Sequence, residues 1–206
     1  MVNAKKVRIA VLVSGGGTNL QALIDAQGAG VISKGEIVLV LSNNADAYGL
    51  TRGENAGIKT AVVSKKECAS QAEFEKKIID TLEENNVELI VLAGFMCILS
   101  KDFTDKYAKR IINVHPSLIP SFCGEGFYGL RVHKAALEKG VKVSGATVHF
   151  VNEIPDGGEI IMQKAVPVEE GDTPETLSHR ILENAEWKIL PMSTELVCDK
   201  ILNNLI

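Results

Sequence analysis

The chain has 206 residues and a mass of 22.2 kDa, which is long enough for one domain with a sizeable hydrophobic core. Hydrophobic residues make up 46% and charged residues 23% of the sequence, and six prolines interrupt it, which argues against a disordered or fibrous protein. The 22 basic and 26 acidic residues give a net charge of -4 without a run of like charges. This balance argues against a broad nucleic-acid-binding surface but leaves room for a local phosphate pocket.

No apolar stretch approaches the roughly 18 residues that a membrane span needs; residues 89–95 are among the longest. The N-terminal segment from Met1 to Lys6 is short and polar, and it shows no signal or transit peptide. We therefore expect a cytoplasmic protein with neither a membrane nor a nucleic acid as partner.

Four cysteines are spread along the chain without a CxxC pair and without a histidine at a spacing typical of metal ligands. They are Cys68, Cys97, Cys123 and Cys198. We expect reduced thiols and no metal site, because this pattern gives little support to a zinc site or a disulfide framework.

The first half of the chain alternates short runs rich in Val, Ile and Leu with helical patterns. The runs are residues 7–13, 36–41, 60–64, 89–95 and 111–114. Between the third and fourth runs, Phe74, Ile78 and Leu82 recur at helical spacing with charged residues on the opposite side. The sequence predicts an α/β fold with a doubly wound, mostly parallel sheet, whose ligands bind beyond the carboxyl ends of the strands.

The second half predicts an antiparallel extension followed by C-terminal helices. Residues 143–151 and 160–168 are rich in β-forming residues and flank a cluster of turn residues. Thr173 can cap a helix that has Pro174 in its first turn. Pro191 should end or kink that helix, before a second apolar stripe from Thr194 to Leu205. Since no linker is visible, we expect residues 1–206 to form one domain.

The segment Ser14 to Asn19 carries three consecutive glycines between an apolar strand and a helical pattern. Glycines permit a tight turn, and exposed amides at a helix N-terminus attract anions, so a phosphate site is favoured over a plain strand-to-helix turn. The segment is neither a dinucleotide fingerprint, since Leu20 replaces the last glycine, nor a P-loop.

Asn113 and His115 lie at the end of the fifth predicted strand, which Pro116 terminates. A histidine can transfer a proton near neutral pH, and an asparagine amide can stabilise an oxyanion. The simpler alternative for a lone His-Pro pair is a histidine that caps a loop.

Asp156 follows the sixth predicted strand, and a carboxylate brought against His115 would raise the pKa of the imidazole and prepare a general acid. An aspartate before two glycines is otherwise most often a turn former. His149 is expected to be packed in a strand near the site rather than catalytic. His133 and His179 are expected on helix surfaces, without a role.

Together, several segments resemble the formyltetrahydrofolate-dependent formyltransferases over nearly the whole chain. They are residues 11–22, 42–47, 92–96, the run Asn-Val-His-Pro-Ser-Leu-Ile-Pro at 113–120, and residues 144–156. The Asn-x-His-Pro-Ser-Leu-x-Pro run with a downstream Asp-Gly is specific to formyl transfer. The glycine-rich start points to the branch of purine biosynthesis that acts on glycinamide ribonucleotide.

The resemblance implies a Rossmann-like formyltransferase fold and a set of site residues. The catalytic residues would be Asn113, His115 and Asp156. The ribonucleotide would be bound by Gly17, Thr18, Asn19 and Glu186, and its phosphate by the half of the domain formed by about residues 1–110. The folate would be bound mainly by the catalytic half, about residues 111–206, and by the segment after the fourth strand; the residues are Gln71, Met96, Cys97, Ile98, Leu99, Asn113, Asn152, Glu153, Ile154, Pro155 and Asp156.

Three departures from the family pattern stand out. Cys97 occupies a position where arginine is common, and Gln71 lies near one where a basic residue contacts the folate. Lys65 or Lys66 is therefore expected to help hold the glutamate tail of the folate. The loop at residues 122–129 is longer than in short-looped members and carries Glu125, which is expected to border the ribonucleotide site.

The implied activity is direct transfer of the formyl group from 10-formyltetrahydrofolate to the primary amine of glycinamide ribonucleotide, by a monomer or homodimer and without a metal. Formyltetrahydrofolate deformylase and methionyl-tRNA formyltransferase carry further domains, and the acidic balance argues against a tRNA substrate. Two alternatives remain, a deformylase-like hydrolase and a non-catalytic folate or nucleotide sensor. The sensor would not need the trio of Asn113, His115 and Asp156.

Overall fold

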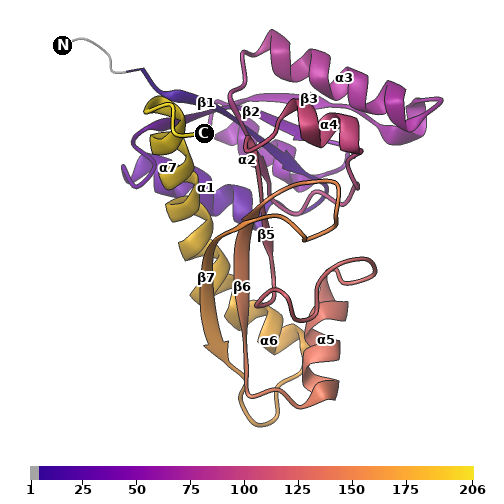
Figure 1. The fold of residues 1–206 in the computed structure, drawn as a ribbon, viewed down its shortest axis with the longest axis vertical. Helices are drawn as coiled ribbons and strands as arrows, with labels where there is room; N and C mark the ends of the chain where they lie inside the picture. Colours follow the sequence, from indigo (N-terminus) through magenta and orange to yellow (C-terminus); the bar gives the residue numbers. More distant parts are fainter. Residues whose placement is uncertain (1–4) are drawn as a thin grey trace.

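The computed structural model describes residues 5–206, so most of the segment Met1 to Lys6, on which the expectation of no targeting signal rests, lies outside it. The strands form one seven-stranded sheet in the order β3-β2-β1-β4-β5-β6-β7 (Figure 1). They are β1 (Val7–Val13), β2 (Gly35–Ser42), β3 (Lys59–Val62), β4 (Leu89–Leu92), β5 (Ile111–His115), β6 (Val143–Phe150) and β7 (Ile160–Pro167). The first five pair in parallel, and β6 and β7 add antiparallel pairs.

The helices alternate with the strands and then end the chain. They are α1 (Thr18–Gly28), α2 (Tyr48–Asn55), α3 (Gln71–Glu84), α4 (Lys101–Lys106), α5 (Leu130–Lys139), α6 (Pro174–Ile181) and α7 (Trp187–Leu202), with a short 3₁₀ turn η1 (Lys65–Glu67) and a π turn η2 (Leu182–Glu186). The predicted fold class is confirmed, including the antiparallel extension and the C-terminal helices.

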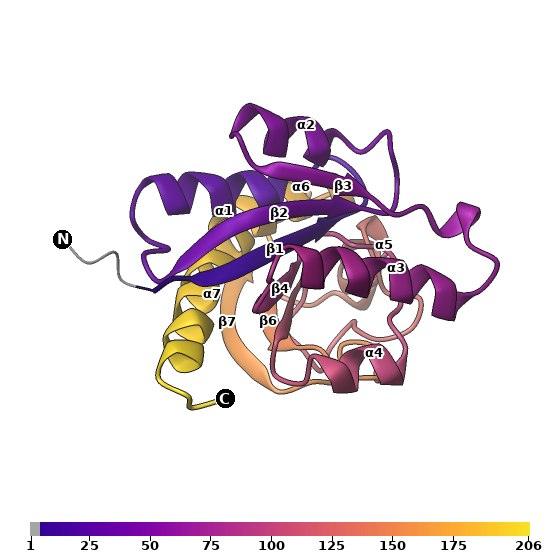
Figure 2. The ribbon, with the colours of Figure 1, turned by 90° about the horizontal axis from the view of Figure 1, so that it is seen from above.

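Two layers of helices cover the two faces of the sheet, as Figure 2 shows from above. Strand alternation divides β1 between them: Val11 and Val13 belong to the core that α1, α2, α6 and α7 cover, whereas Leu12 belongs to the core beneath α3 and α4. Phe74 and Ile78 of α3 are fully buried, as their helical spacing predicts. Burial on both faces explains why these strands are continuously apolar.

The fourth predicted strand is shorter than its apolar run suggests. β4 ends at Leu92 rather than Phe95, because Gly94 adopts a φ of 77° and turns the chain out of the sheet. The amide of Ser14, just after β1, donates a hydrogen bond of 3.1 Å to the carbonyl of Gly94. Chain order reverses between β1 and β4, so these two strand ends border the crevice where such sheets bind ligands.

The C-terminal helices agree with the prediction at their start but not at Pro191. Thr173 caps α6 by accepting a hydrogen bond of 3.3 Å from the amide of Thr176, with Pro174 in the first turn. Pro191 lies inside α7 and does not end the helix. The helix is instead irregular about one turn before Pro191, where residues 182–186 form the π turn η2, because Pro191 has no amide hydrogen to donate. Leu205 was expected in the buried stripe but is 68% exposed, because α7 ends at Leu202.

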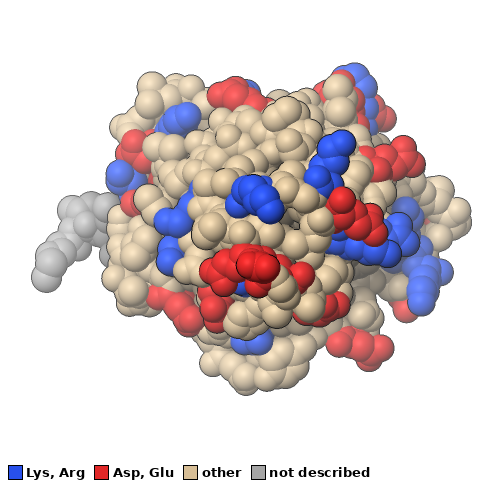
Figure 3. All heavy atoms as spheres, turned by 90° about the horizontal axis from the view of Figure 1, so that it is seen from below, with Lys and Arg blue, Asp and Glu red and all other residues tan. Residues whose placement is uncertain are grey.

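No helix within residues 5–206 is long and apolar enough to cross a bilayer. On the face of the molecule drawn in Figure 3, basic side chains are scattered between groups of acidic ones. The four cysteines are free thiols.

Candidate active site

The end of β5 brings two polar side chains to the carboxyl edge of the sheet. Asn113 and His115 are two residues apart on this strand, and β6 places His149 directly opposite Asn113. The amide Nδ2 of Asn113 lies 3.2 Å from Nε2 of His149. Because β5 and β6 are hydrogen-bonded along their length, this cluster is held by the sheet itself.

Asp156 completes the cluster from the loop between β6 and β7. Its Oδ2 lies 3.3 Å from Nδ1 of His115, and its Oδ1 lies 3.5 Å from Nε2 of His149. The amide of Gly124 donates a further hydrogen bond of 2.9 Å to Oδ2. The backbone of Asp156 has a φ of 55°, a conformation that aspartate tolerates better than most residues and that turns the carboxylate inward. The structure therefore unites Asn113, His115 and Asp156, which come from two separate parts of the sequence.

Both ring nitrogens of His115 face acceptors. Nε2 lies 2.9 Å from the carbonyl oxygen of Phe122, while Nδ1 faces Asp156. A neutral imidazole has one N–H, so only an imidazolium could donate to both groups at once. His115 is 4% exposed, however, and the charged form is costly to bury.

Burial has the larger effect on the pKa of His115. It lowers the pKa below the ordinary value of a histidine, although the charge of Asp156 and the Phe122 carbonyl act in the opposite direction. Asp156 thus raises the pKa of the imidazole, as expected, but burial lowers it further than Asp156 raises it. Burial also disfavours ionisation of Asp156, but the hydrogen bond with His149, the charge of His115 and the Gly124 amide together lower the pKa of this carboxyl. Near neutral pH, both shifts favour a neutral imidazole beside an ionised carboxylate.

The other three histidines lie in different surroundings. His149 is packed in β6 beside the site, as expected, and contacts both Asn113 and Asp156. His179 is on a helix surface, with 68% of its side chain exposed. The prediction for His133 is wrong, because α5 turns this residue inward to 2% exposure, and burial lowers its pKa to about 4.

The glycine-rich turn lies between β1 and α1. Gly17 has a φ of 69°, and a Cβ atom there would come 2.7 Å from the Cα of Gly49, so only glycine fits. The helix begins at Thr18, where free backbone amides can bind an anion. The side chain of Arg52 extends over this turn, and its Nε donates a hydrogen bond of 2.8 Å to the carbonyl of Gly16. Nothing in the sequence around Arg52 signals this position.

Glu186 reaches the same turn from the C-terminal half of the chain. The Nδ2 atom of Asn19 donates a hydrogen bond of 2.6 Å to Oε2 of Glu186, whose side chain is buried. Burial raises the pKa of Glu186 to about 7, and the hydrogen bond from Asn19 opposes this only in part. The Oδ1 atom of Asn19 is buried without a hydrogen-bond partner among the described residues. The four residues predicted to bind the ribonucleotide are therefore neighbours.

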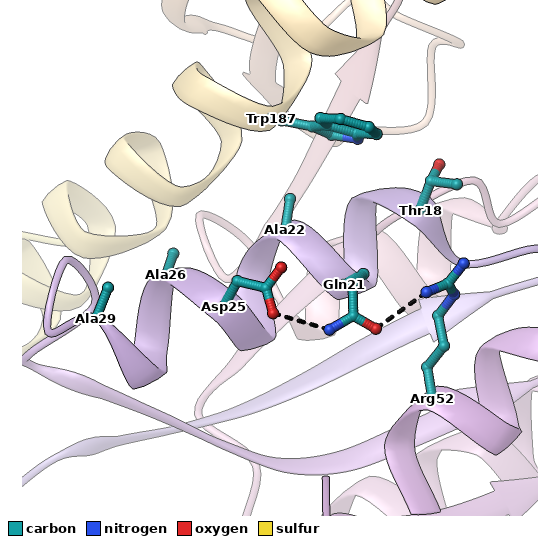
Figure 4. Close-up of a pocket in the computed structure, with 8 residues that line it drawn as sticks. All are labelled: Thr18, Gln21, Ala22, Asp25, Ala26, Ala29, Arg52 and Trp187. Carbon is teal, nitrogen blue, oxygen red and sulfur yellow. Dashed lines mark hydrogen bonds between the residues drawn. The ribbon is translucent and has the colours of Figure 1, made fainter. Parts of the chain in front are cut away.

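A groove runs along α1 beside this turn, with Trp187 and Arg52 on its two sides (Figure 4). Thr18 lines the end nearest the glycine-rich turn, and the floor consists of alanines of α1. None of the residues that line the groove belongs to the cluster around His115.

A pocket beside the cluster of Asn113, His115 and Asp156 unites most of the residues predicted to bind folate. One wall is formed by the segment after β4 and the other by the loop after β6. Its lining residues are Leu92, Phe95, Cys97, Ile98, Leu99, Asn113, His149, Val151, Asn152, Glu153, Ile154, Pro155 and Asp156. Ile98 and Ile154 are 66% and 58% exposed, which leaves apolar surface open to a flat ring system.

Two predicted folate residues, Gln71 and Met96, are not among those that line this pocket. The amide nitrogen of Gln71 instead donates hydrogen bonds to Glu75 and to the carbonyl of Ile98. The backbone amide of Met96 donates a hydrogen bond of 2.8 Å to Oγ of Ser14, next to the glycine-rich turn. The segment after β4 is thus held at both ends.

Comparisons with known proteins agree with this arrangement. A family model described as "Formyl transferase" matches residues 7–194. The chain is 50% identical over 196 residues to the trifunctional purine biosynthetic protein adenosine-3 of Gallus gallus, which covers 95% of this chain. The match covers 19% of that relative, so the chain spans about a fifth of its length.

Two further proteins are similar over most of their own length. The chain is 45% identical to a phosphoribosylglycinamide formyltransferase of Haemophilus influenzae, covering 90% of this chain and 84% of the relative. The crystal structure of glycinamide ribonucleotide transformylase 1 from Symbiobacterium toebii has a TM-score of 0.89 at 42% identity, covering 96% of this chain and 90% of that one. The chain belongs to the formyl transferase family.

Proposed function

We propose that this protein transfers the formyl group of 10-formyltetrahydrofolate to the primary amine of glycinamide ribonucleotide, a step of purine biosynthesis. The observation that carries the proposal is the cluster of Asn113, His115 and Asp156 at the edge of a pocket with exposed apolar walls. An oxyanion stabiliser, a proton carrier and a carboxylate are the groups that acyl transfer to an amine needs.

The formyl donor would occupy the pocket between the segment after β4 and the loop after β6. Cys97, Ile98 and Leu99 line it on one side, and residues 152–156 on the other. Met96 would contribute through its backbone, and Lys65 or Lys66 would help hold the glutamate tail. Gln71 would act through the loop that it binds rather than by direct contact.

The ribonucleotide would bind with its phosphate at the amides of Gly17, Thr18 and Asn19, where the start of α1 favours negative charge. Glu186, buried against Asn19, would accept hydrogen bonds from the ribose. In this proposal, about residues 1–110 bind the phosphate, and about residues 111–206 carry out catalysis and make most of the folate contacts. Both halves belong to one domain over residues 1–206.

The reaction would proceed without a covalent intermediate on the protein. The amine nitrogen attacks the formyl carbon, and the oxyanion that forms accepts hydrogen bonds from Asn113 and His115. The oxyanion adds a second negative charge, besides that of Asp156, close to His115. These two charges favour the imidazolium, so His115 gains a proton as the oxyanion forms. The proton leaves the amine by way of Asp156 or a water and reaches N10 of the folate through His115, as the bond from N10 to the formyl carbon breaks.

His115 must exchange one partner for this step. Its Nε2 is bound to the Phe122 carbonyl and its Nδ1 faces Asp156, so the oxyanion would replace the Phe122 carbonyl. A cytoplasmic monomer or homodimer that acts on small molecules, without a metal, remains part of the proposal.

Product identification tests the proposal. The protein is incubated with both substrates, and the ribonucleotide is analysed by mass spectrometry with fragmentation. We expect one added formyl group on the former primary amine. An unmodified ribonucleotide beside consumed folate would contradict the proposal.

A further inference from the structure

Glu75 is a buried carboxylate of α3 that the proposed mechanism does not use. It is 5% exposed, and hydrogen-bond donors from two segments surround it. Its Oε1 accepts a hydrogen bond of 2.6 Å from Nε2 of Gln71 and one of 2.7 Å from the amide of Ser100. Its Oε2 accepts a short hydrogen bond from the hydroxyl of Ser100.

Ser100 marks the end of the segment that lines the folate pocket. Its Oγ caps α4 by accepting a hydrogen bond of 3.3 Å from the amide of Phe103. The amide of Gln71 that binds Glu75 also donates a hydrogen bond of 3.1 Å to the carbonyl of Ile98. Glu75 therefore fixes the distal end of the segment Met96–Leu99 both directly and through Gln71.

The other end of the segment is bound to the sheet. The amide of Met96 donates a hydrogen bond to Ser14 Oγ, which follows β1. Between these two attachments, Ile98 exposes two thirds of its surface, and the lining residues Cys97 and Leu99 flank it. The segment Met96–Leu99, which forms this wall of the pocket, is therefore held in place by the hydrogen bonds at its two ends.

The carboxylate of Glu75 holds the segment Met96–Leu99 more firmly than a neutral group would. Hydrogen bonds to an ionised acceptor are stronger than neutral ones, and moving the segment would leave a buried charge without its donors. Displacement of Ser100 would also remove the cap of α4. Glu75 thereby couples the position of the pocket wall to the rigid helix α3.

We propose that Glu75 is a positioning residue for the folate site: it holds the segment Met96–Leu99 in the conformation that binds the formyl donor, without contacting the donor. The inference rests on the proposed function, because it takes the pocket to be the folate site. Gln71 then has a structural role, because its side-chain amide links Glu75 to the carbonyl of Ile98.

Two variants and a control test the inference. Glu75→Ala removes every acceptor, whereas Glu75→Gln keeps one oxygen for the Gln71 and Ser100 amides and places an amide beside the Ser100 hydroxyl, which can accept. Glu84→Ala is the control, since Glu84 is an exposed glutamate of the same helix. Amide hydrogen exchange of residues 96–100, binding of 10-formyl-5,8-dideazafolate, and both Michaelis constants are measured for each protein.

We expect Glu75→Ala to accelerate exchange in residues 96–100 and to weaken folate binding about tenfold, as the loss of charge-assisted hydrogen bonds implies. The Michaelis constant of the ribonucleotide should stay within about twofold, and Glu75→Gln should recover most of the folate affinity. Unchanged exchange and folate affinity in Glu75→Ala would overturn the inference. Equal losses for both substrates, with a lowered melting temperature, would also overturn it, because they indicate general destabilisation.

The two proposals can fail separately. If the unaltered protein binds the folate analogue but does not formylate the ribonucleotide, the proposed function is wrong, while exchange and folate affinity still test Glu75. If the unaltered protein does not bind the analogue, both the folate site and the role of Glu75 are wrong.

Discussion

The carboxylate of Asp156 lies between two imidazoles, with Oδ2 at 3.3 Å from His115 Nδ1 and Oδ1 at 3.5 Å from His149 Nε2. One half-buried negative charge can balance one positive charge, so only one of these histidines can be protonated at low cost. Each ring also has its other nitrogen near a backbone carbonyl oxygen: Nε2 of His115 lies 2.9 Å from that of Phe122, and Nδ1 of His149 lies 2.8 Å from that of Phe150. Asp156 therefore links the two histidines, and a change in its charge acts on both of them.

Replacing Asp156 with asparagine should weaken the proton transfer by His115. Asp156 raises the pKa of His115 against the effect of burial, so its loss lowers this pKa further and reduces the protonated fraction at any given pH. We expect turnover to fall about a hundredfold or more, with the proton-dependent limb of the pH profile moved to lower pH. The pH dependence of kcat and kcat/KM measures this, and a profile that matches the unaltered protein would remove Asp156 from the mechanism.

Replacing His115 with alanine should reduce turnover far more than ribonucleotide binding. The change removes the group that carries the proton to the departing folate nitrogen, a role worth about 10²- to 10⁴-fold in rate. The phosphate contacts at the glycine-rich turn come from other elements, so the ribonucleotide Kd should stay within about twofold. Single-turnover kinetics and calorimetric titration separate the two quantities. His179→Ala is the matched control, and equal turnover in both variants would contradict the assignment.

Glu186 should make the folded protein less stable as pH rises. Burial raises its pKa to about 7 in the folded state from the ordinary 4.5 of a glutamate, so between these pH values the folded state holds a proton that the unfolded state releases. The free energy of unfolding should therefore fall by about 3 kcal/mol between pH 4.5 and 7 through this group alone. Glu186→Gln should lack this loss and exceed the unaltered protein in stability at pH 8.

Urea denaturation at several pH values measures the effect of Glu186. Glu183→Gln, which changes a more exposed carboxyl on the same turn, is the control. Parallel pH curves for Glu186→Gln and the unaltered protein would show that Glu186 ionises normally.

Cys97→Arg should strengthen folate binding. Cys97 lines the pocket proposed to bind folate, and burial raises the pKa of its thiol, so it offers no charge to a folate carboxylate. A guanidinium there could pair with the glutamate tail, and we expect the folate Michaelis constant to fall about threefold to tenfold. Cys97→Ser is the uncharged control. A folate analogue without the glutamate should show no gain, and no gain with the full folate would leave Cys97 without a role in affinity.

Much of the fold follows from local patterns in the sequence. Continuous apolar runs identify strands buried on both faces, and the spacing of Phe74, Ile78 and Leu82 identifies α3, because such periodicities reflect burial directly. The apolar run predicts a strand through Phe95, but β4 ends at Leu92 because Gly94 turns the backbone. The sequence likewise predicts an exposed His133, because a single histidine does not reveal which side of α5 is buried.

The site was predictable only in part. The residue types and the glycine-rich turn indicate the chemistry, and the family resemblance supplied the pairing of Asp156 with His115. The lowered pKa of His115 depends on burial, which no short sequence pattern encodes. Contacts between distant segments, such as Arg52 over Gly16 and Gln71 on Ile98, likewise arise from the packing of separate helices.

The most direct test of the account follows release of the formyl group spectrophotometrically. Purified protein is mixed with 10-formyltetrahydrofolate, with and without glycinamide ribonucleotide. We expect tetrahydrofolate to form only when the ribonucleotide is present. Release without the ribonucleotide would indicate a hydrolase instead, and demonstrated binding of both ligands with no release would indicate a non-catalytic binding protein; either result would contradict the account.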